Sequence, residues 1–401
     1  MSTRTLVKSS FVELASSGRL VKSGTWLPFG EDDLKPQHLI AASRESGTLA
    51  LCVATKAKFI EGNGCKDKTF YQAKINKRQK VDGLLRDLVK DLAQFEGFAL
   101  LINYNALLQV ASVQHLPFEK CRQCKPDAQD VVHNIAVVNR LDKYQQQHGL
   151  RKTQPEFYPV FNPDKAIVQA QIEAAEGLAN YKGQILYYFH EKPGSRYYPS
   201  PLYEAVWEDI VTEVALKRSR KRDVKSGFSA KTMITLYGSE SPTKEVREQD
   251  SKDYKEFTGE DGYSVLVQYA KNKDSKADID PFQAPDVSQR YVTDEKAVKT
   301  NIKEIFQIPD VLYGTAVAGS LGLSTMVQDA IDYVIEHVVN TDQRAIEENF
   351  KLVFSNWREP ICPSGDFSIH NFGTDLQSNE EQDKPDPFAE QIAKARAELR
   401  G

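Results

Sequence analysis

Cys121 and Cys124 have the spacing of a metal or redox site. Two residues separate them, as in half of a zinc site or in a dithiol redox pair. His115 and His133 are near in sequence, but no second Cys-x-x-Cys pair and no His-x-x-x-His pair completes a ligand set. Two reduced cysteines beside a strand are therefore favoured over a zinc site.

Other patterns typical of catalysis are incomplete. The seven histidines are scattered, and neither His-Glu-x-x-His nor Gly-x-Ser-x-Gly occurs. The glycine-rich stretch from Gly314 to Gly322 lacks the lysine of a phosphate-binding loop and follows a helical pattern rather than a strand. Glu336 and His337 are adjacent, so they point in different directions, and with Glu347 and Glu348 they indicate a solvated helix face. We predict no catalytic residue, no cofactor and no metal ligand.

Composition indicates a folded protein with more than one domain. The chain has 401 residues, of which 40% are hydrophobic and 27% charged, which is enough for two or three domains with a substantial core. No apolar run reaches the length of a membrane span, and the odd number of scattered cysteines favours reduced thiols. The net charge of −4 excludes a generally basic nucleic-acid coat, so any contact with DNA must be local.

The first half of the chain alternates between helical and strand patterns, which predicts an α+β fold. Apolar residues at helical spacing predict a helix over Lys80 to Gln94. Phe98 to Asn103 and Leu107 to Val113 flank a turn and predict a β-hairpin. A strand follows over Gly183 to His190.

The second half is dominated by longer helices. Ser200 and Pro201, types favoured at an N-cap and at the first helical position, predict a helix over Leu202 to Ser226. An insert over 228–285 then predicts a strand, a helix and a strand. The remaining predictions are a helix capped at Thr293-Asp294-Glu295 and ending near Pro309, a loop over Asp310 to Gly322, a long helix over Ser324 to Trp357 bent around Asn340 to Asp342, and a short helix over Pro387 to Arg400.

Three segments resemble those of phage portal proteins, the head-tail connectors of tailed double-stranded DNA phages. Tyr198 to Ala205 (YPSPLYEA) resembles the entry to the portal stem helix. Asn301 to Gly314 (NIKEIFQIPDVLYG) resembles the helix and Phe-Gly-Val-Pro-Pro segment of the family, with Gln307 where glycine is usual and Asp310 in place of the second proline. Asp91 to Pro117 resembles the stretch in which a wing helix leads through Gly-Phe-Ala into a hairpin.

The resemblance implies the domain order of a portal subunit. It implies a mixed α/β wing, a two-helix stem, a small β-α-β clip, a long wing helix and a short helical crown. The bounds are 1–199 for the wing, 200–227 for the first stem helix, 228–285 for the clip, 286–308 for the second stem helix, 309–322 for the tunnel loop, 323–359 for the long wing helix and 360–401 for the crown and C-terminal tail.

The resemblance also implies the function. Subunits would form a dodecameric ring at one capsid vertex, assembled in the host cytoplasm and retained in the virion, for genome packaging and ejection. Partners would be the terminase motor, then a head-tail adaptor, the major capsid protein, and double-stranded DNA passing through the channel, with no membrane.

A channel must let DNA slide, so few phosphate contacts are expected in it. The small residues of the tunnel loop fit this demand: Thr315, Ala316, Val317, Ala318 and Ser320. Basic residues at the end of the first stem helix are candidate phosphate contacts: Lys217, Arg218, Arg220, Lys221 and Arg222. Matching of the helix dipole, or salt bridges to Glu245, Glu248 and Asp250, is the favoured alternative for these cations.

Two other functions stay open. One is a metal- or nucleotide-dependent enzyme of unknown type on the α+β part, which needs a pocket around Cys121, Cys124 and His133. The other is a different ring component of the virion, such as a head-tail adaptor. The portal hypothesis instead predicts adjacent antiparallel helices over 200–226 and 294–306, and apolar surface left for neighbouring subunits.

Overall fold

The computed structural model describes residues 25–138, 154–225, 232–237, 265–270, 287–314 and 323–372. The contacts within the chain divide it into two compact units, Met1–Ala205 with Lys303–Gly401, and Val206–Ile302. Among the described helices, none has the length and apolar character that crossing a membrane requires. Helices and small sheets together make the predicted α+β fold.

The described part of the first unit begins with four helices, and two of them have a side-chain N-cap. The Ser46 hydroxyl accepts a hydrogen bond from the backbone N–H of Leu49 at 3.1 Å, and Asp67 accepts from the N–H of Thr69 at 2.8 Å. The helices are α1 (Lys35–Glu45), α2 (Gly47–Glu61), α3 (Lys68–Gln72) and α4 (Val81–Phe95). The predicted apolar stripe of α4 is fully buried at Val81, Leu84, Leu85, Leu88 and Leu92, so the periodicity identified both the helix and its inner face.

α4 leads directly into a three-stranded antiparallel sheet of order β2-β1-β6. β1 (Gly97–Tyr104) and β2 (Val110–Leu116) form the predicted hairpin. Its turn is stabilised by the Asn105 side chain, whose Oδ1 accepts from the N–H groups of Leu107 and Gln109 at 2.9 Å each. β6 (Gln184–Phe189) is the predicted third strand and pairs with the other edge of β1.

A second small sheet has the order β3-β4-β5. Arg122 on β3 is completely buried. Its Nε lies 2.5 Å from Asp33 Oδ1, and Nη1 donates to the carbonyls of Glu119 and Cys121 at 2.9 and 2.8 Å. This buried pair ties the segment before α1 to the sheet. The elements here are β3 (Cys121–Gln123), β4 (Asn134–Val137), β5 (Glu156–Pro159) and the following helix α6 (Lys165–Ala174).

The chain returns to the first unit through a long, interrupted helix. α10 (Leu323–Val334) and α11 (Asn340–Phe354) are separated by one π-helical turn, η5 (Ile335–Val339). The predicted bend was placed around Asn340 to Asp342, and the irregular turn lies directly before it. α11 packs onto α3, where Phe70 makes edge contacts with Phe350 and Phe354 at centroid distances of 5.8 and 5.2 Å.

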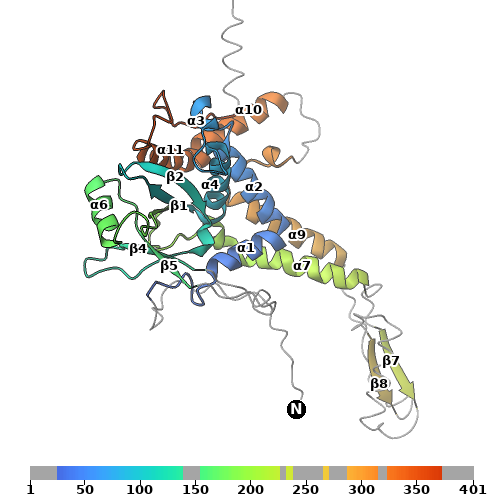
Figure 1. Ribbon diagram of the computed structural model, residues 1–401. Helices are drawn as coiled ribbons and strands as arrows, with labels where there is room; N and C mark the ends of the chain where they lie inside the picture. The colour runs from blue at the N-terminus through green and yellow to red at the C-terminus, as the bar shows by residue number, and fades with distance from the viewer. Residues whose placement is uncertain are drawn as a thin grey trace, which may run out of the picture. The chain divides into compact units, whose positions relative to one another are not determined.

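The second unit contains the elements predicted for the stem and the insert. α7 (Trp207–Lys225) and α9 (Val287–Glu304) are its helices, and Figure 1 shows them side by side. β7 (Thr232–Tyr237) and β8 (Val265–Ala270) pair in parallel. The predicted helix within the insert, the predicted helix over Pro387 to Arg400 and the first 24 residues lie outside the described residues.

Two predicted helix starts in this region are wrong. Leu202–Val206 is a 3₁₀ turn, η2, and the α-helix begins only at Trp207. The N–H of Glu204 donates to the Pro201 carbonyl at 2.9 Å, the three-residue step of a 3₁₀ turn. α9 begins at Val287, so Thr293, Asp294 and Glu295 lie inside the helix and do not cap it.

Candidate functional site

The helix pair, α7 with α9, is antiparallel. Asn301 Nδ2 donates to Asp209 at 3.3 Å near one end of the pair, and Arg220 Nη1 donates to Glu295 Oε2 at 2.5 Å further along. Residue numbers therefore rise along α7 as they fall along α9. Ile210 and Val214 of α7 and Val298 and Ile302 of α9 are buried, so each helix buries apolar side chains at helical spacing.

Most of the cations predicted to contact phosphate are exposed, and two of them have acidic partners within the helix pair. Lys217 Nζ lies 2.7 Å from Glu213 Oε1, and Arg220 pairs with Glu295. A hydrogen bond from Lys299, together with the charges of Lys299 and Arg220, lowers the pKa of Glu295. Arg218 and Lys221 are exposed, while the side chain of Arg222 and residues Glu245, Glu248 and Asp250 lie outside the described residues.

The chain reaches α7 through a segment that Glu96 holds. Glu96 ends α4 in the left-handed conformation, with φ of 59°. Its Oε1 accepts from the N–H of Leu202 at 3.0 Å, and its Oε2 lies 2.5 Å from Lys192 Nζ. Its carbonyl accepts from the N–H of His190 at 2.9 Å. One buried residue thus fixes both the end of β6 and the start of η2.

Ser200 was predicted as the helix N-cap, but its hydroxyl has a different role. Its Oγ donates to Glu204 Oε2 at 2.8 Å, and Glu204 also forms an ion pair with Lys35 of α1 at 2.8 Å. The acceptor that caps the first turn comes from Glu96, about a hundred positions earlier in the sequence. Local capping rules do not detect such a distant acceptor.

Tyr203 connects η2 to α4 and to the segment after α9. Its hydroxyl donates to the Gln94 carbonyl at 2.7 Å and accepts from Gln94 Nε2 at 2.8 Å. Its ring is stacked on Phe306, with centroids 6.0 Å apart and planes 10° apart. We call Glu96, Lys192, Leu202, Tyr203 and Phe306 the joint, because they bring together the segments on either side of the second unit.

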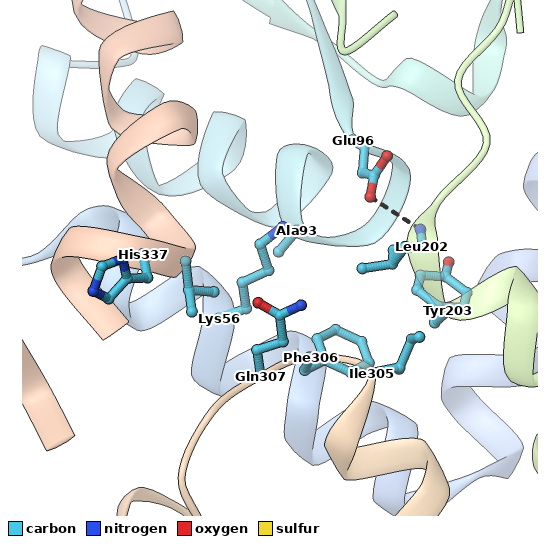
Figure 2. A pocket seen from close by; sticks show the side chains of 10 residues that line it. Lys56, Ala93, Glu96, Leu202, Tyr203, Ile305, Phe306, Gln307 and His337 are labelled. Atoms are coloured by element: carbon cyan, nitrogen blue, oxygen red, sulfur yellow. Dashed lines mark hydrogen bonds between the residues drawn. The ribbon is translucent and has the colours of Figure 1, made fainter. Parts of the chain in front are cut away.

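A small cavity of about 120 Å³ lies at the joint (Figure 2). Two of its charged groups already have partners: Lys56 pairs with Asp342 at 3.0 Å, and Glu96 holds Leu202 and Lys192. The cavity is too small for a typical ligand, and we interpret it as a packing feature of the joint. It is lined by Lys56, Ala93, Glu96, Leu202, Tyr203, Ile305, Phe306, Gln307, His337 and Val338.

A buried ion cluster holds the interrupted helix next to the joint. Asp342, near the start of α11, accepts from His190 Nε2 at 2.6 Å and pairs with Lys56 of α2. Burial alone would raise the pKa of Asp342, but the charge of Lys56 and the hydrogen bond from His190 outweigh it and lower the pKa below its ordinary value. The carboxylate is therefore charged when the helix is in place.

Gln307 follows α9 in the left-handed region, with φ of 55°. Glycine adopts this conformation without steric cost, which gives a physical reason for the glycine usual at this position in the family that the sequence resembles. The chain then passes Pro309 into the short turn η4 (Asp310–Tyr313). The predicted tunnel-loop residues Thr315, Ala316, Val317, Ala318 and Ser320 follow and lie outside the described residues.

In the described part of the chain, Cys121 and Cys124 have separate surroundings. Cys121 is buried on β3 with its thiol 3.7 Å from the Pro117 carbonyl, whereas Cys124 packs with Ala136, Val138 and Trp26. Burial raises the pKa of the Cys124 thiol to about 11, so this thiol is protonated at neutral pH and is not an activated nucleophile.

The two nearby histidines have acidic partners elsewhere. His115 Nε2 lies 2.7 Å from Asp91, and His133 Nε2 lies 2.6 Å from Asp127. Within the described part of the chain, no three histidine, cysteine or acidic side chains are placed to hold a metal ion. The cysteines and histidines named as an enzyme candidate therefore do not converge.

Comparisons with known proteins give matches among solved structures only. No protein-family model and no curated protein matches the sequence. A chain in the virion of a native gene transfer agent particle matches with a TM-score of 0.48 and 13% identity, covering 80% of each chain. A chain in the neck of the native particle, computed with C12 symmetry, gives 0.49 and 12%, covering 81% of this chain and 82% of that one. An HK97-family phage portal protein from Corynebacterium diphtheriae gives 0.42 and 9%, covering 81% and 91%.

Proposed function

We propose that this chain is one subunit of a phage portal ring, the channel through which DNA enters and leaves a capsid. The observation that carries the proposal is the antiparallel pair of α7 and α9. These helices lie at the two ends of the segment Val206–Ile302, which forms a compact unit of its own. The segments at the two ends of the pair, Tyr198 to Ala205 and Asn301 to Gly314, are two of those whose sequences resemble portal proteins. In this proposal α7 and α9 are the stem, and β7 with β8 belongs to the clip.

Exposed apolar side chains support the assembly of subunits. Met326 and Tyr333 lie seven residues apart on α10, hence on the same face of the helix, and their exposed fractions are 49% and 44%. Leu352 on α11 is 44% exposed. Such side chains are expected at subunit contacts of a ring.

The remaining roles follow from this assignment. The ring is dodecameric and occupies one capsid vertex beside the major capsid protein, the clip contacts the terminase and later the head-tail adaptor, and residues 315–320 border the DNA. Lys221, which is exposed, is a better candidate for a sparse phosphate contact than Lys217 or Arg220, because those two already have acidic partners. The role is structural rather than enzymatic.

The test is the assembly state of the full-length protein at modest salt, from particle masses and from end-on views in negative-stain electron microscopy. We expect rings with a central hole wide enough for a DNA duplex. A paired variant, Met326→Glu with Tyr333→Glu, should reduce the ring fraction strongly, whereas Thr325→Glu with Asp329→Lys on the same helix should not. Particles of single-chain mass over the whole accessible concentration range would overturn the proposal.

A further inference from the structure

A basic turn stands beside β2, the edge strand of the β2-β1-β6 sheet. Lys74 and Lys80 form an isolated antiparallel bridge, and the residues between them make the turn. A hollow of about 900 Å³ lies along the turn and β2, and a second of about 530 Å³ lies beside it. Lys74 and Arg358 line both hollows, so the two form one continuous surface, which we call the basic groove.

Five exposed cations line the basic groove. They are Lys68, Lys74, Lys77, Arg78 and Arg358. Among the described residues none of them forms an ion pair, although cations elsewhere in this unit do, such as Lys35 with Glu204. The acid that lines the groove is Glu359, which is exposed. A group of unneutralised cations raises the local potential and attracts an anionic partner.

The turn is held rigidly. Asn76 Oδ1 accepts from the N–H groups of Arg78 and Gln79 at 2.8 Å each, and its Nδ2 donates to the Val113 carbonyl at 2.9 Å. The N–H of Val113 donates in return to the carbonyl of Ile75, which is buried. The backbone that carries Lys77 and Arg78 is thus ordered before any partner binds, which lowers the entropy cost of binding.

We propose that the basic groove binds the phosphate backbone of double-stranded nucleic acid without regard to sequence. Ser112 and Gln114 line the larger hollow beside the cations, and their side chains are of the kind that donates hydrogen bonds to phosphate oxygens. The larger hollow is lined by no aromatic side chain of the kind that anchors protein partners, and Trp357, which lines the smaller one, is buried. A duplex is therefore favoured over an acidic protein segment.

The proposal goes beyond the channel function and does not depend on it. The basic groove belongs to the first unit, whereas the stem cations of α7 belong to the second. Contact with DNA at the groove would occur whether or not twelve subunits enclose a channel.

The test compares two full-length variants of equal charge. The groove variant carries Lys74→Gln, Lys77→Gln, Arg78→Gln and Arg358→Gln. The control carries Arg44→Gln, Lys58→Gln, Lys125→Gln and Lys165→Gln, four exposed cations away from the groove. Binding of short fluorescent duplexes of two unrelated sequences is followed by anisotropy over a range of salt concentrations, and particle masses confirm that the assembly state is the same.

We expect the groove variant to bind at least about tenfold more weakly at low salt. The slope of log K against log salt is negative, and its magnitude should decrease by about 0.9 for each phosphate that the variant no longer neutralises. Both duplexes should bind more weakly by the same factor, and the control should bind like the unaltered protein. If the groove variant does not fold, a smaller variant with Lys77→Gln and Arg78→Gln in the turn replaces it. This variant should reduce the magnitude of the slope by about twice 0.9. Equal slopes for groove and control variants, or binding of poly-glutamate in preference to the duplex, would overturn the proposal.

Discussion

Glu96 gives the sharpest test of how the joint is held. Replacing it with alanine removes the acceptor of the Leu202 N–H and the partner of Lys192. A partly buried donor left without an acceptor costs about 1–2 kcal/mol. The ion pair adds about 1 kcal/mol or less, because the Lys192 side chain is 32% exposed. We therefore expect Glu96→Ala to lower the free energy of unfolding by about 2 kcal/mol.

A matched series separates the contributions. Glu96→Gln keeps an oxygen acceptor for Leu202 and should remove only the ion pair, which costs about 1 kcal/mol or less. Glu96→Gly removes both interactions but relieves the left-handed backbone by about 1 kcal/mol, so it should lie between the other two. The control is Glu176→Ala, because Glu176 has the same φ of 59° and is exposed.

Urea unfolding of the full-length protein measures these differences from the midpoint at constant slope. The expected order of destabilisation is Glu96→Ala, then Glu96→Gly and Glu96→Gln, with Glu176→Ala near zero. Equal destabilisation by Glu96→Ala and Glu96→Gln would show that capping of Leu202 contributes nothing. Destabilisation by Glu176→Ala as large as that by Glu96→Ala would refute the assignment altogether.

Two further predictions concern the buried charges of the first unit. Arg122→Met should lower the free energy of unfolding by about 3–5 kcal/mol, because it leaves the buried Asp33 without its cation. The control Arg196→Met breaks an exposed pair with Asp130 and should cost about 1 kcal/mol or less in the same urea assay. Similar costs for the two variants would contradict this reasoning. Because the pKa of Asp342 is lowered in the folded state, its contribution to stability is present above its ordinary pKa of 3.8 and is lost as the pH falls through the lower folded value. The stability difference between the unaltered protein and Asp342→Asn should therefore shrink as the pH falls below 3.8, and a constant difference would exclude the predicted linkage.

The sequence predicted those elements whose signals are local. The helix α4, the β1-β2 hairpin and β6 were identified from periodicity and turn residues, because each buries a face that its own spacing defines. The antiparallel pairing of the two long helices was predicted from the resemblance to portal proteins. The individual helices and strands, in contrast, depend on residues that are near each other in the sequence.

The errors lie where distant residues decide the local structure. Ser200 has the type of an N-cap, yet Glu96 supplies the acceptor and the first turn becomes 3₁₀. Thr293 and Asp294 also have the type of a cap, yet α9 continues through them. A capping residue type shows that a helix can begin at a position, but tertiary contacts decide whether it does.

The roles of the lysines and arginines also depend on distant residues, and these roles decide which cations can bind a partner. With 52 basic and 56 acidic residues, the sequence provides no means of telling a cation that holds the fold from one that is free to bind a partner. In the structure Lys35, Lys56 and Lys192 each have a carboxylate partner around the joint. Lys74, Lys77, Arg78 and Arg358 gather on one surface with no such partner among the described residues. Removal of a joint cation should therefore appear in the free energy of unfolding, and removal of a groove cation in the salt dependence of DNA binding.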